Sequence, residues 1–352
     1  MRRRARWLLR GLAMALGALL AAAIAGGYWF HQRLETPYLA HPGAVDVEIS
    51  SGTPARHILD SLEQAGVVRD AWVARLYLVY GLDDPPLRAG EYRFEGPLTI
   101  PQALDKLVRG AVLRHPVTVV EGLTLEETAA ALASAGFGEH RALLAEMRDP
   151  SRIRDLDPLA ETLEGYLFPD TYSFARGVSA KRVVDTLVQT FRRRFGEAAE
   201  TGRLRASVTL ASIVEKEAQR ADERPLIAGV YRNRLARGIA LYADPTLIFA
   251  KKQDGSWDGN LRKADLDMDS PYNTYRRAGL PPGPICSPGL ASLEAAYDPA
   301  DVPYLYFVSR NDGSHVFATT LAEHNHNVEV WQRRYWRRRW AEERRQRSPL
   351  RR

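Results

Sequence analysis

The chain has 352 residues, 45% of them hydrophobic, and a single cysteine, Cys286, which excludes an intramolecular disulfide and is expected to pack in the core. The net charge of +6 lies at the two ends, because the first ten residues contribute +5 and residues 333–352 contribute +8, which leaves −7 on the body. An acidic body argues against a nucleic-acid-binding domain, whose positive charge would lie on the fold itself.

The first predicted element is a transmembrane helix over residues 11–30. This stretch carries no charge, and at ~1.5 Å per residue its length matches a ~30 Å hydrocarbon core. Arginines precede it, so residues 1–10 are expected to form a cytoplasmic tail, with everything after the helix outside the cytoplasm. A cleaved signal peptide is the alternative, although its apolar stretch is usually shorter.

Residues 31–44 are predicted to form a linker, and an internal repeat follows them. Gly52 and Gly122 each come after an alternating strand and before an apolar-striped helix. Gly66 and Gly136 come just after those helices, where a helix C-cap favours glycine. In both copies the second glycine lies 14 residues after the first. The sequence therefore predicts two strand–helix units of the same design.

The first unit continues with a helix near residues 70–80, a strand at 90–94 and a helix at 100–108. This order of elements resembles a LysM-type glycan-binding module, so residues 45–115 are predicted to form a small LysM-like α/β subdomain. A packing subdomain without a ligand is the alternative reading.

Residues 116–332 are predicted to form a mixed α+β catalytic domain, because helices and short strands follow one another without regular βαβ alternation. In chain order the pattern predicts helices at 181–195, 206–219, 222–238 and 244–251, a hairpin of strands 304–308 and 315–318, and a helix from Leu321. Asp244 is expected to be the N-cap of its helix, with Pro245 at the first helical position. Residues 333–352 form a basic tail, interpreted as a solvated helix end, with contact to anionic lipid or an acidic polymer as the alternative.

The predicted helix over residues 206–219 ends in two carboxylates, Glu215 and Glu217. At ~100° per residue, Glu217 lies on the face of three bulky aliphatic side chains, whereas Glu215 points about 160° away. The aliphatic residues are Leu210, Ile213 and Val214. A carboxyl among apolar groups loses hydration, and its raised pKa suits a general acid near neutral pH. The alternative is a partly exposed charged cluster at a helix end.

The sequence lacks the motifs that are typical of several other enzyme classes. It has no glycine-rich phosphate loop, no cysteine–histidine cluster and no serine nucleophile elbow. His324 and His326 are two residues apart and so point to different faces of a helix. No metal and no cofactor are therefore expected, and a single acid beside loops rich in Tyr, Asn and Gly suggests glycan cleavage.

Five segments together carry a family resemblance. They are residues 164–172 (EGYLFPDTY), 211–217 (ASIVEKE), 244–246 (DPT), 272–275 (YNTY) and 279–285 (GLPPGPI). In this order they resemble the YceG-like endolytic murein transglycosylases, over roughly residues 45–330. The resemblance implies a single-pass enzyme of the inner membrane, with a cytoplasmic N-terminus and a periplasmic catalytic domain, which cuts nascent peptidoglycan strands and leaves 1,6-anhydro-N-acetylmuramic ends.

The resemblance maps the catalytic acid to Glu217. Substrate-binding residues are expected in the loops around it: Tyr272, Asn273, Tyr275, Asp244, Thr246 and Glu164. The alternative for these residues is loop scaffolding, and Glu164 in particular can be a structural hydrogen-bond acceptor. His315 and Asn325 are further candidates to line the site.

Two other functions remain open from the sequence. One is a non-catalytic peptidoglycan-binding scaffold, and the other is a muramidase-type hydrolase, which would need a second carboxylate to activate water. The expected partners are peptidoglycan glycan strands and the membrane, with peptidoglycan synthases implied only by the resemblance and no nucleic acid.

Overall fold

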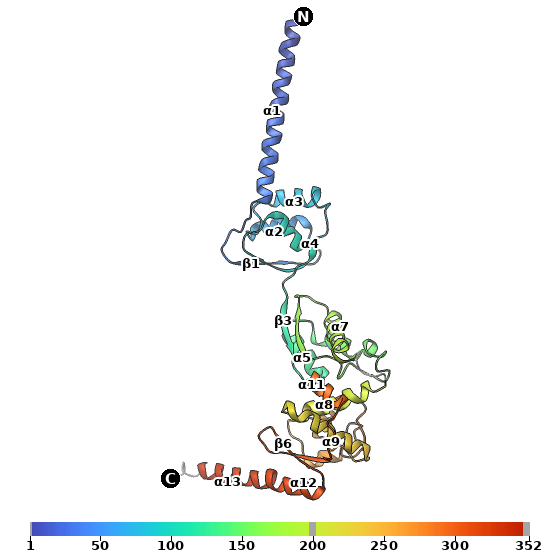
Figure 1. Cartoon of the computed structure of the whole chain (residues 1–352). Coiled ribbons are helices and arrows are strands. Elements are labelled where there is room, and N and C mark those ends of the chain that lie inside the picture. Colours follow the sequence, from blue (N-terminus) through green and yellow to red (C-terminus); the bar gives the residue numbers. More distant parts are fainter. Residues whose placement is uncertain (1, 197–201, 348–352) are drawn as a thin grey trace. The chain divides into compact units, whose positions relative to one another are not determined.

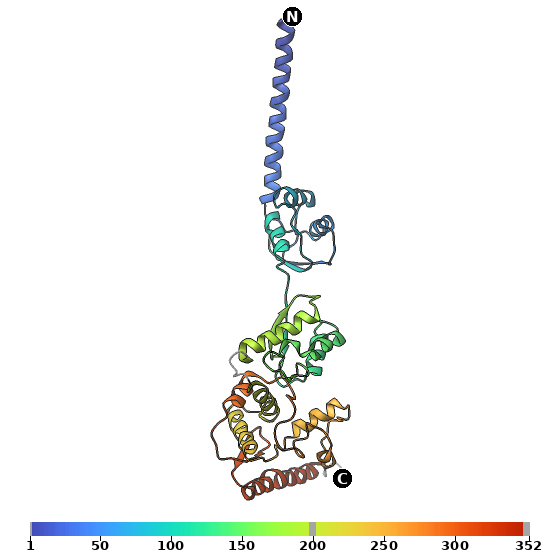
Figure 2. The same cartoon turned by 90° about the vertical axis from the view of Figure 1, so that its right-hand side faces the viewer.

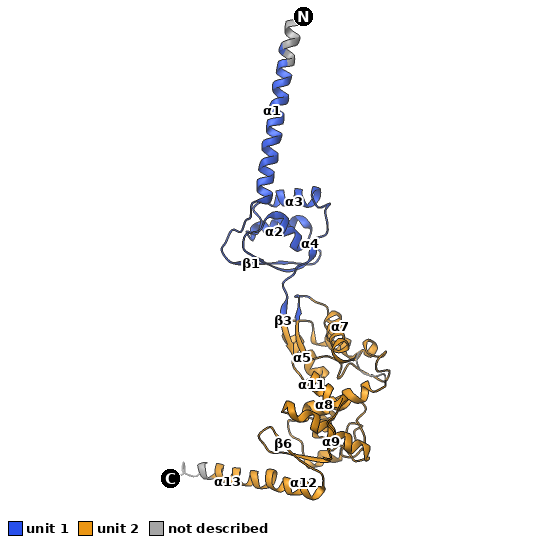
Figure 3. Cartoon of the chain, in the orientation of Figure 1, with its two compact units in different colours: residues 1–115, 173–177 blue, residues 116–172, 178–352 orange. Residues whose placement is uncertain are grey.

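The computed structural model describes residues 2–196 and 202–347. The chain divides into two compact units, residues 1–115 with 173–177 and residues 116–172 with 178–352 (Figure 3). Each unit combines helices with short strands, and the three sheets each pair two strands. The fold is therefore mixed α+β, as the sequence predicts.

The first unit begins with α1 (Arg2–Glu35), a single unbroken helix (Figure 1). Its portion Arg10–Glu35 is long and apolar enough to cross a membrane, and none of its most apolar window is buried within the protein. The predicted span 11–30 lies inside this helix. The predicted linker is wrong at its start, because residues 31–35 continue the helix before the chain turns.

The rest of the first unit is a two-stranded antiparallel sheet with three helices. Strand β1 (Ala44–Ile49) pairs with β2 (Gly90–Glu95). The helices are α2 (Ala55–Gln64), α3 (Ala71–Tyr80) and α4 (Ile100–Arg109). Tyr92 and Phe94 of β2 are fully buried and pack with the apolar faces of these helices, so the alternating pattern of the strand defines the core.

The sequence repeat is also a repeat in backbone conformation. The first glycines of the two copies, Gly52 and Gly122, have φ of 81° and 78°. The second glycines, Gly66 and Gly136, have φ of 73° and 81°. Glycine adopts this left-handed conformation without the cost that a side chain adds, so both copies need glycine at both positions.

The second unit holds most of the remaining elements. Its helices are α5 (Leu125–Ser134), α6 (His140–Arg148), α7 (Ala180–Phe191), α8 (Leu204–Glu217), α9 (Arg224–Ala236), α10 (Asp244–Gln253), α11 (Leu290–Tyr297), α12 (Leu321–Val328) and α13 (Tyr335–Arg347). Strand β3 (His115–Val119) pairs with β4 (Asp170–Phe174), and β5 (Tyr306–Ser309) pairs antiparallel with β6 (His315–Ala318). The β5–β6 pairing confirms the predicted hairpin.

Helix α8 lies at the centre of this unit and packs against α9, α10 and α11. It is buried on nearly all sides between Ser207 and Val214. Ser212 accepts a hydrogen bond from the backbone N–H of Ile285 at 3.0 Å, and the thiol of Cys286 donates to the Ser212 carbonyl at 3.3 Å. Cys286 is fully buried, which confirms its packing role. The last turn of α8 lies in less crowded surroundings, and Glu217 ends it.

Two predicted details change in the structure. The N-cap of α10 is Ala243, and Asp244 is the first helical residue with Pro245 second, because the Asp244 side chain bonds elsewhere instead of capping the helix. The C-terminal helix from Leu321 is confirmed, and it continues through a π-helical turn at Glu329–Arg334 into α13 (Figure 2). Residues 348–352 of the predicted tail, and Met1, lie outside the described residues.

Candidate active site

Glu217 is the last residue of α8 and its side chain is half-buried. The hydroxyl of Tyr231 donates to Oε1 of Glu217 at 3.3 Å. Loss of hydration, and then the negative charge of Asp244, raise the pKa of Glu217 to about 7, against the opposing effects of Tyr231 and Arg234. A carboxyl with this pKa holds its proton in a large fraction of molecules at neutral pH, as a general acid must.

Helix α9 supplies two side chains that act on Glu217, Tyr231 and Arg234. Tyr231 and Arg234 are three residues apart, so both side chains leave the same face of the helix. Arg234 is buried and donates to the carbonyls of Leu305 at 2.7 Å and Leu241 at 2.5 Å. Its guanidinium also lies 5.9 Å from the ring centre of Tyr231. These bonds fix a positive charge at one place near the acid.

A second carboxylate comes from the start of α10. Asp244 is exposed, and its Oδ1 accepts a hydrogen bond from the Tyr275 hydroxyl at 2.5 Å. The ring of Tyr275 contacts that of Tyr242 edge to face, with centres 5.4 Å apart. Asp244 and Tyr275, both predicted from the sequence, therefore lie together, and the charge of Asp244 acts on Glu217.

Asn273 and Thr246 lie within the scaffold of the same region. The amide of Asn273 donates to the carbonyls of Leu266 and Met268, at 3.0 and 2.7 Å, and the Asn273 side chain is fully buried. Thr246 is also fully buried and donates to the Ala243 carbonyl at 2.8 Å. Their polar groups are used inside the fold, which favours the scaffolding alternative for these two residues over substrate contact.

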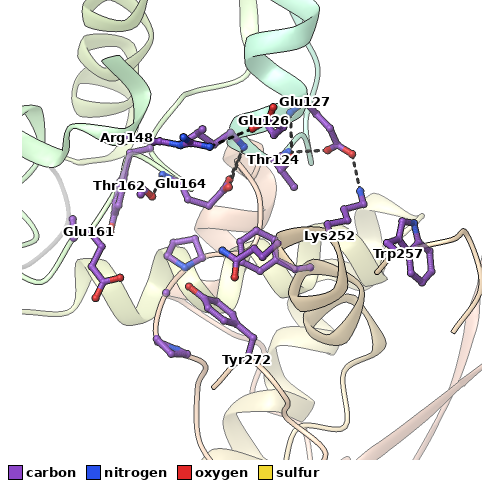
Figure 4. Close-up of a pocket in the computed structure, with 18 of the residues that line it drawn as sticks. Thr124, Glu126, Glu127, Arg148, Glu161, Thr162, Glu164, Lys252, Trp257 and Tyr272 are labelled. Atoms are coloured by element: carbon purple, nitrogen blue, oxygen red, sulfur yellow. Dashed lines mark hydrogen bonds and ion pairs between the residues drawn. The ribbon is translucent and has the colours of Figure 1, made fainter. Parts of the chain in front are cut away.

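Tyr272 and Glu164 line a different space, a cavity of about 700 Å³ (Figure 4). Both carboxyl oxygens of Glu164 accept from the backbone N–H of Leu125, at 3.0 and 3.1 Å. Burial raises the pKa of Glu164 to about 8. Glu164 is thus a hydrogen-bond acceptor, as its alternative reading predicts, and also a wall of the cavity. Glu217 is not among the residues that line it.

Glu215 leaves the opposite side of α8, as its position in the helix predicts. Its carboxylate accepts from the Gly289 N–H at 3.1 Å and from the Ser292 hydroxyl at 2.7 Å. Arg224 approaches it at 3.5 Å. These contacts tie α8 to the start of α11, so Glu215 has a structural role and Glu217 is the chemically available carboxyl of the pair.

Two further candidates fall outside the site. His315 is buried in contact with Glu223, its Nδ1 lying 2.6 Å from the carboxylate, and Asn325 is exposed on α12. Neither touches Glu217 through a hydrogen bond or ion pair of the described residues.

Sequence reasoning missed Tyr231, Arg234 and Tyr242. The first two carry a weak signal, the i, i+3 spacing on one helix, but nothing in the sequence brings that helix beside Glu217. Tyr242 is half-exposed, with φ of 50°, a conformation uncommon for a residue with a side chain. A tyrosine two residues before Asp244 was the available hint.

The site supports acid–base chemistry by side chains. Within residues 2–196 and 202–347, no three His, Cys, Asp or Glu side chains come together as a metal site would require. One carboxyl with a pKa near neutrality, a second carboxylate nearby and the exposed ring of Tyr242 define the class of enzymes that cleave bonds by carboxyl acid–base catalysis.

The chain belongs to the YceG-like family, whose model matches residues 47–330. It is 32% identical to the endolytic murein transglycosylase of Bacillus subtilis, over 80% of this chain and 83% of that protein. It is 29% identical to the endolytic murein transglycosylase of Streptococcus pneumoniae, over 88% of this chain and 63% of that longer protein. The crystal structure of a putative YceG-like protein of Listeria monocytogenes is also similar, with 32% identity and a TM-score of 0.53, over 80% of this chain and 98% of that chain.

Proposed function

We propose that the protein is an endolytic murein transglycosylase that cleaves peptidoglycan glycan strands, with Glu217 as its catalytic acid and base. The observation that carries the role of Glu217 is its pKa of about 7 at the end of a buried helix, beside Tyr231 and Asp244. The names of the relatives, which match over most of this chain, support the reaction and the substrate.

The reaction uses one carboxyl twice. Protonated Glu217 donates its proton to the oxygen of the β-1,4 bond between N-acetylmuramic acid and N-acetylglucosamine, and the C1–O bond breaks. Positive charge develops at C1, and the ionised Glu217 then removes the proton of the C6 hydroxyl as its oxygen attacks C1. The product is a 1,6-anhydro end, and no water is consumed. A pKa near 7 suits both halves of this cycle, since neither protonation state is strongly disfavoured.

The test is the pair Glu217→Gln and Glu294→Gln in the full chain. Loss of the acid is expected to lower cleavage of uncrosslinked glycan by about 10²–10⁴-fold, with the melting temperature unchanged or raised. Glu294 is exposed on α11 and serves as the matched control, with activity near that of the wild type. Full activity of the Glu217→Gln variant would remove this residue from the mechanism.

Hydrolysis is a second candidate, which the position of Asp244 favours. A muramidase needs a second carboxylate to activate water or to attack C1, and Asp244 is close enough for its charge to raise the pKa of Glu217. Mass spectrometry separates the two reactions, because the fragment with the new reducing end from hydrolysis is about 18 Da heavier than the corresponding anhydro fragment. Anhydro ends support the transglycosylase, and reducing ends support the hydrolase.

The finer predictions about location and organisation belong to the same proposal. Helix α1 would anchor the chain in the inner membrane with the cytoplasmic tail at residues 1–10 and the catalytic domain, residues 116–332, in the periplasm. Residues 45–115 would be a LysM-like subdomain, and their strand–helix–helix–strand order supports that reading. A peptidoglycan synthase as partner rests on the family resemblance and location.

A further inference from the structure

We infer that the 700 Å³ cavity of the second unit is a saccharide-binding site, separate from Glu217, that holds a distant part of the same glycan strand. This inference rests on the proposed function for the identity of the strand. Its walls come from α5, α6, the loop before β4, the start of α8, the end of α10 and the loops around residues 257, 272 and 283. A cavity of this size is typical of a site for a small molecule or a short oligomer.

One wall of the cavity lies far from Glu217 along two helices. Arg205 at the start of α8 lines the cavity, whereas Glu217 ends that helix, ~18 Å further along. Lys252 near the end of α10 also lines the cavity, and Asp244, whose charge acts on Glu217, begins α10, ~12 Å away. A glycan strand that fills both places must therefore extend well beyond the bond being cut.

Each cation that lines the cavity already has a carboxylate partner. Lys252 forms an ion pair with Glu127 at 2.6 Å. Arg205 pairs with the buried Asp157 at 2.6 Å and also donates to the Pro282 carbonyl. Arg148 lies 3.7 Å from Glu126 (Figure 4). A ligand rich in carboxylates, such as a peptide stem, would therefore find no free positive charge among the residues that line the cavity.

Hydroxyl-binding groups and flat apolar surfaces remain. Glu161 forms no ion pair with any described residue, and in Figure 4 its carboxylate extends toward the side of the cavity where Tyr272 lies. Burial is the main cause of the raised pKa of Tyr272, and the negative charges of Glu164 and then Glu161 add to it, so these groups are close to Tyr272. Trp257 and the Tyr272–Phe249 pair, with ring centres 4.9 Å apart, offer aromatic faces. Carboxyl and phenol groups bind hydroxyls, and aromatic rings pack against the C–H faces of sugars.

Glu164 adds a group with spare hydrogen-bonding capacity. Both of its oxygens accept from the Leu125 N–H, and the backbone N–H of Gly165 is a further donor to the carboxyl. In its protonated form the carboxyl can also donate one hydrogen bond. A sugar hydroxyl or acetamido carbonyl in the cavity would accept such a bond. The Tyr272 hydroxyl, the carboxyls of Glu164 and Glu161 and the aromatic rings are therefore the kinds of group that bind a saccharide.

The experiment measures binding of a peptide-free N-acetylglucosamine–N-acetylmuramic acid octasaccharide to the full chain in detergent, in the Glu217→Gln background so that no cleavage occurs. Adding Trp257→Ala is expected to weaken binding about tenfold, and adding Glu161→Gln about threefold. The control Glu139→Gln removes the same charge from the exposed start of α6, with an unchanged Kd expected. Melting temperatures verify that each variant is folded.

A second measurement separates this inference from the proposed function. In the active chain, Trp257→Ala is expected to raise KM for long strands, with kcat and the product mass unchanged. Unchanged octasaccharide binding in both cavity variants would overturn the inference. It would also be overturned if the same substitutions weakened binding of a free stem peptide and left binding of the octasaccharide unchanged. Neither outcome bears on whether Glu217 cleaves glycan, since the binding assay needs no cleavage.

Discussion

The hydroxyl of Tyr231 donates a hydrogen bond to Oε1 of Glu217 over 3.3 Å. Tyr231 is buried, and loss of hydration raises its pKa well above the usual value, so this hydroxyl stays a donor. A bond donated to a carboxylate favours its ionised form and lowers its pKa. Tyr231 therefore opposes the effect of burial on Glu217 and keeps the acid near neutrality.

Tyr231→Phe is expected to raise the pKa of Glu217 further. Activity requires the protonated acid, so it falls as the pH rises through that pKa, which is about 7 in the wild type. The alkaline limb of the kcat/KM profile should move upward by about 0.5–1 pH unit in the variant. Tyr80→Phe, at an exposed site of the first unit, is the control with an unchanged profile. A downward shift would show that Tyr231 does not stabilise the carboxylate.

Asp244→Asn should move the same limb the other way. The negative charge of Asp244 raises the pKa of Glu217, and an asparagine removes that charge while keeping an acceptor for the Tyr275 hydroxyl. We expect activity at pH 7 to fall a few-fold and to recover near pH 5.5. Loss of activity at every pH, with reducing-end products in the wild type, would instead identify Asp244 as the carboxylate that activates water.

Glu164 and Glu217 also predict how stability depends on pH. Their pKa values in the folded protein are about 8 and about 7, above the usual 4.5. Between pH 4.5 and these values the folded state binds more protons than the unfolded state, so the stability they contribute below pH 4.5 is lost as the pH rises. Glu164→Gln removes this loss and should raise the melting temperature by about 2–6 °C at pH 8.5.

The same variant is compared at pH 5, where Glu164 is protonated in the folded wild type and the difference should largely vanish. Glu139→Gln, at an exposed position, is the control and should leave the melting temperature unchanged at both pH values. An equal effect of Glu164→Gln at pH 5 and pH 8.5 would mean that titration of this carboxyl is not its cause.

Local sequence patterns predict the elements of this fold well. The turn residues 311–314 (NDGS) signal the β5–β6 hairpin, and the glycines of the repeat fix left-handed positions, so both follow from neighbours in the chain. The opposite directions of Glu215 and Glu217 follow from helix geometry alone. The cap of α10 shifts by one residue because the Asp244 carboxylate bonds to Tyr275, 31 residues away, and helix-end preferences do not include that partner.

In the candidate site, too, the sequence predicts what depends on neighbours in the chain and not what depends on distant elements. Sequence order groups Tyr272, Asn273 and Tyr275 in one short segment, and all three are predicted there as substrate ligands. In the structure the three side chains point to a cavity, into the scaffold and to Asp244. Which of these surroundings each side chain meets depends on elements distant in the chain, so the segment is predictable and the separate roles are not.

Tyr242 provides the last prediction, because a strained backbone conformation holds its ring beside Tyr275 and Arg234. Its φ of 50° is disfavoured for a residue with a side chain, by about 1 kcal/mol, and its ring is half-exposed beside Tyr275. A strained, exposed ring close to the acid suggests that it stacks on a sugar. Tyr242→Gly removes the ring and relieves the backbone, while its greater chain entropy opposes the gain. The melting temperature should therefore stay within about 2 °C, and KM for glycan should rise about five- to tenfold with kcat nearly unchanged.

Asp84→Gly relieves a similar φ of 52° in the first unit and is the matched control, with KM unaffected. An unchanged KM in Tyr242→Gly would exclude this ring from substrate binding.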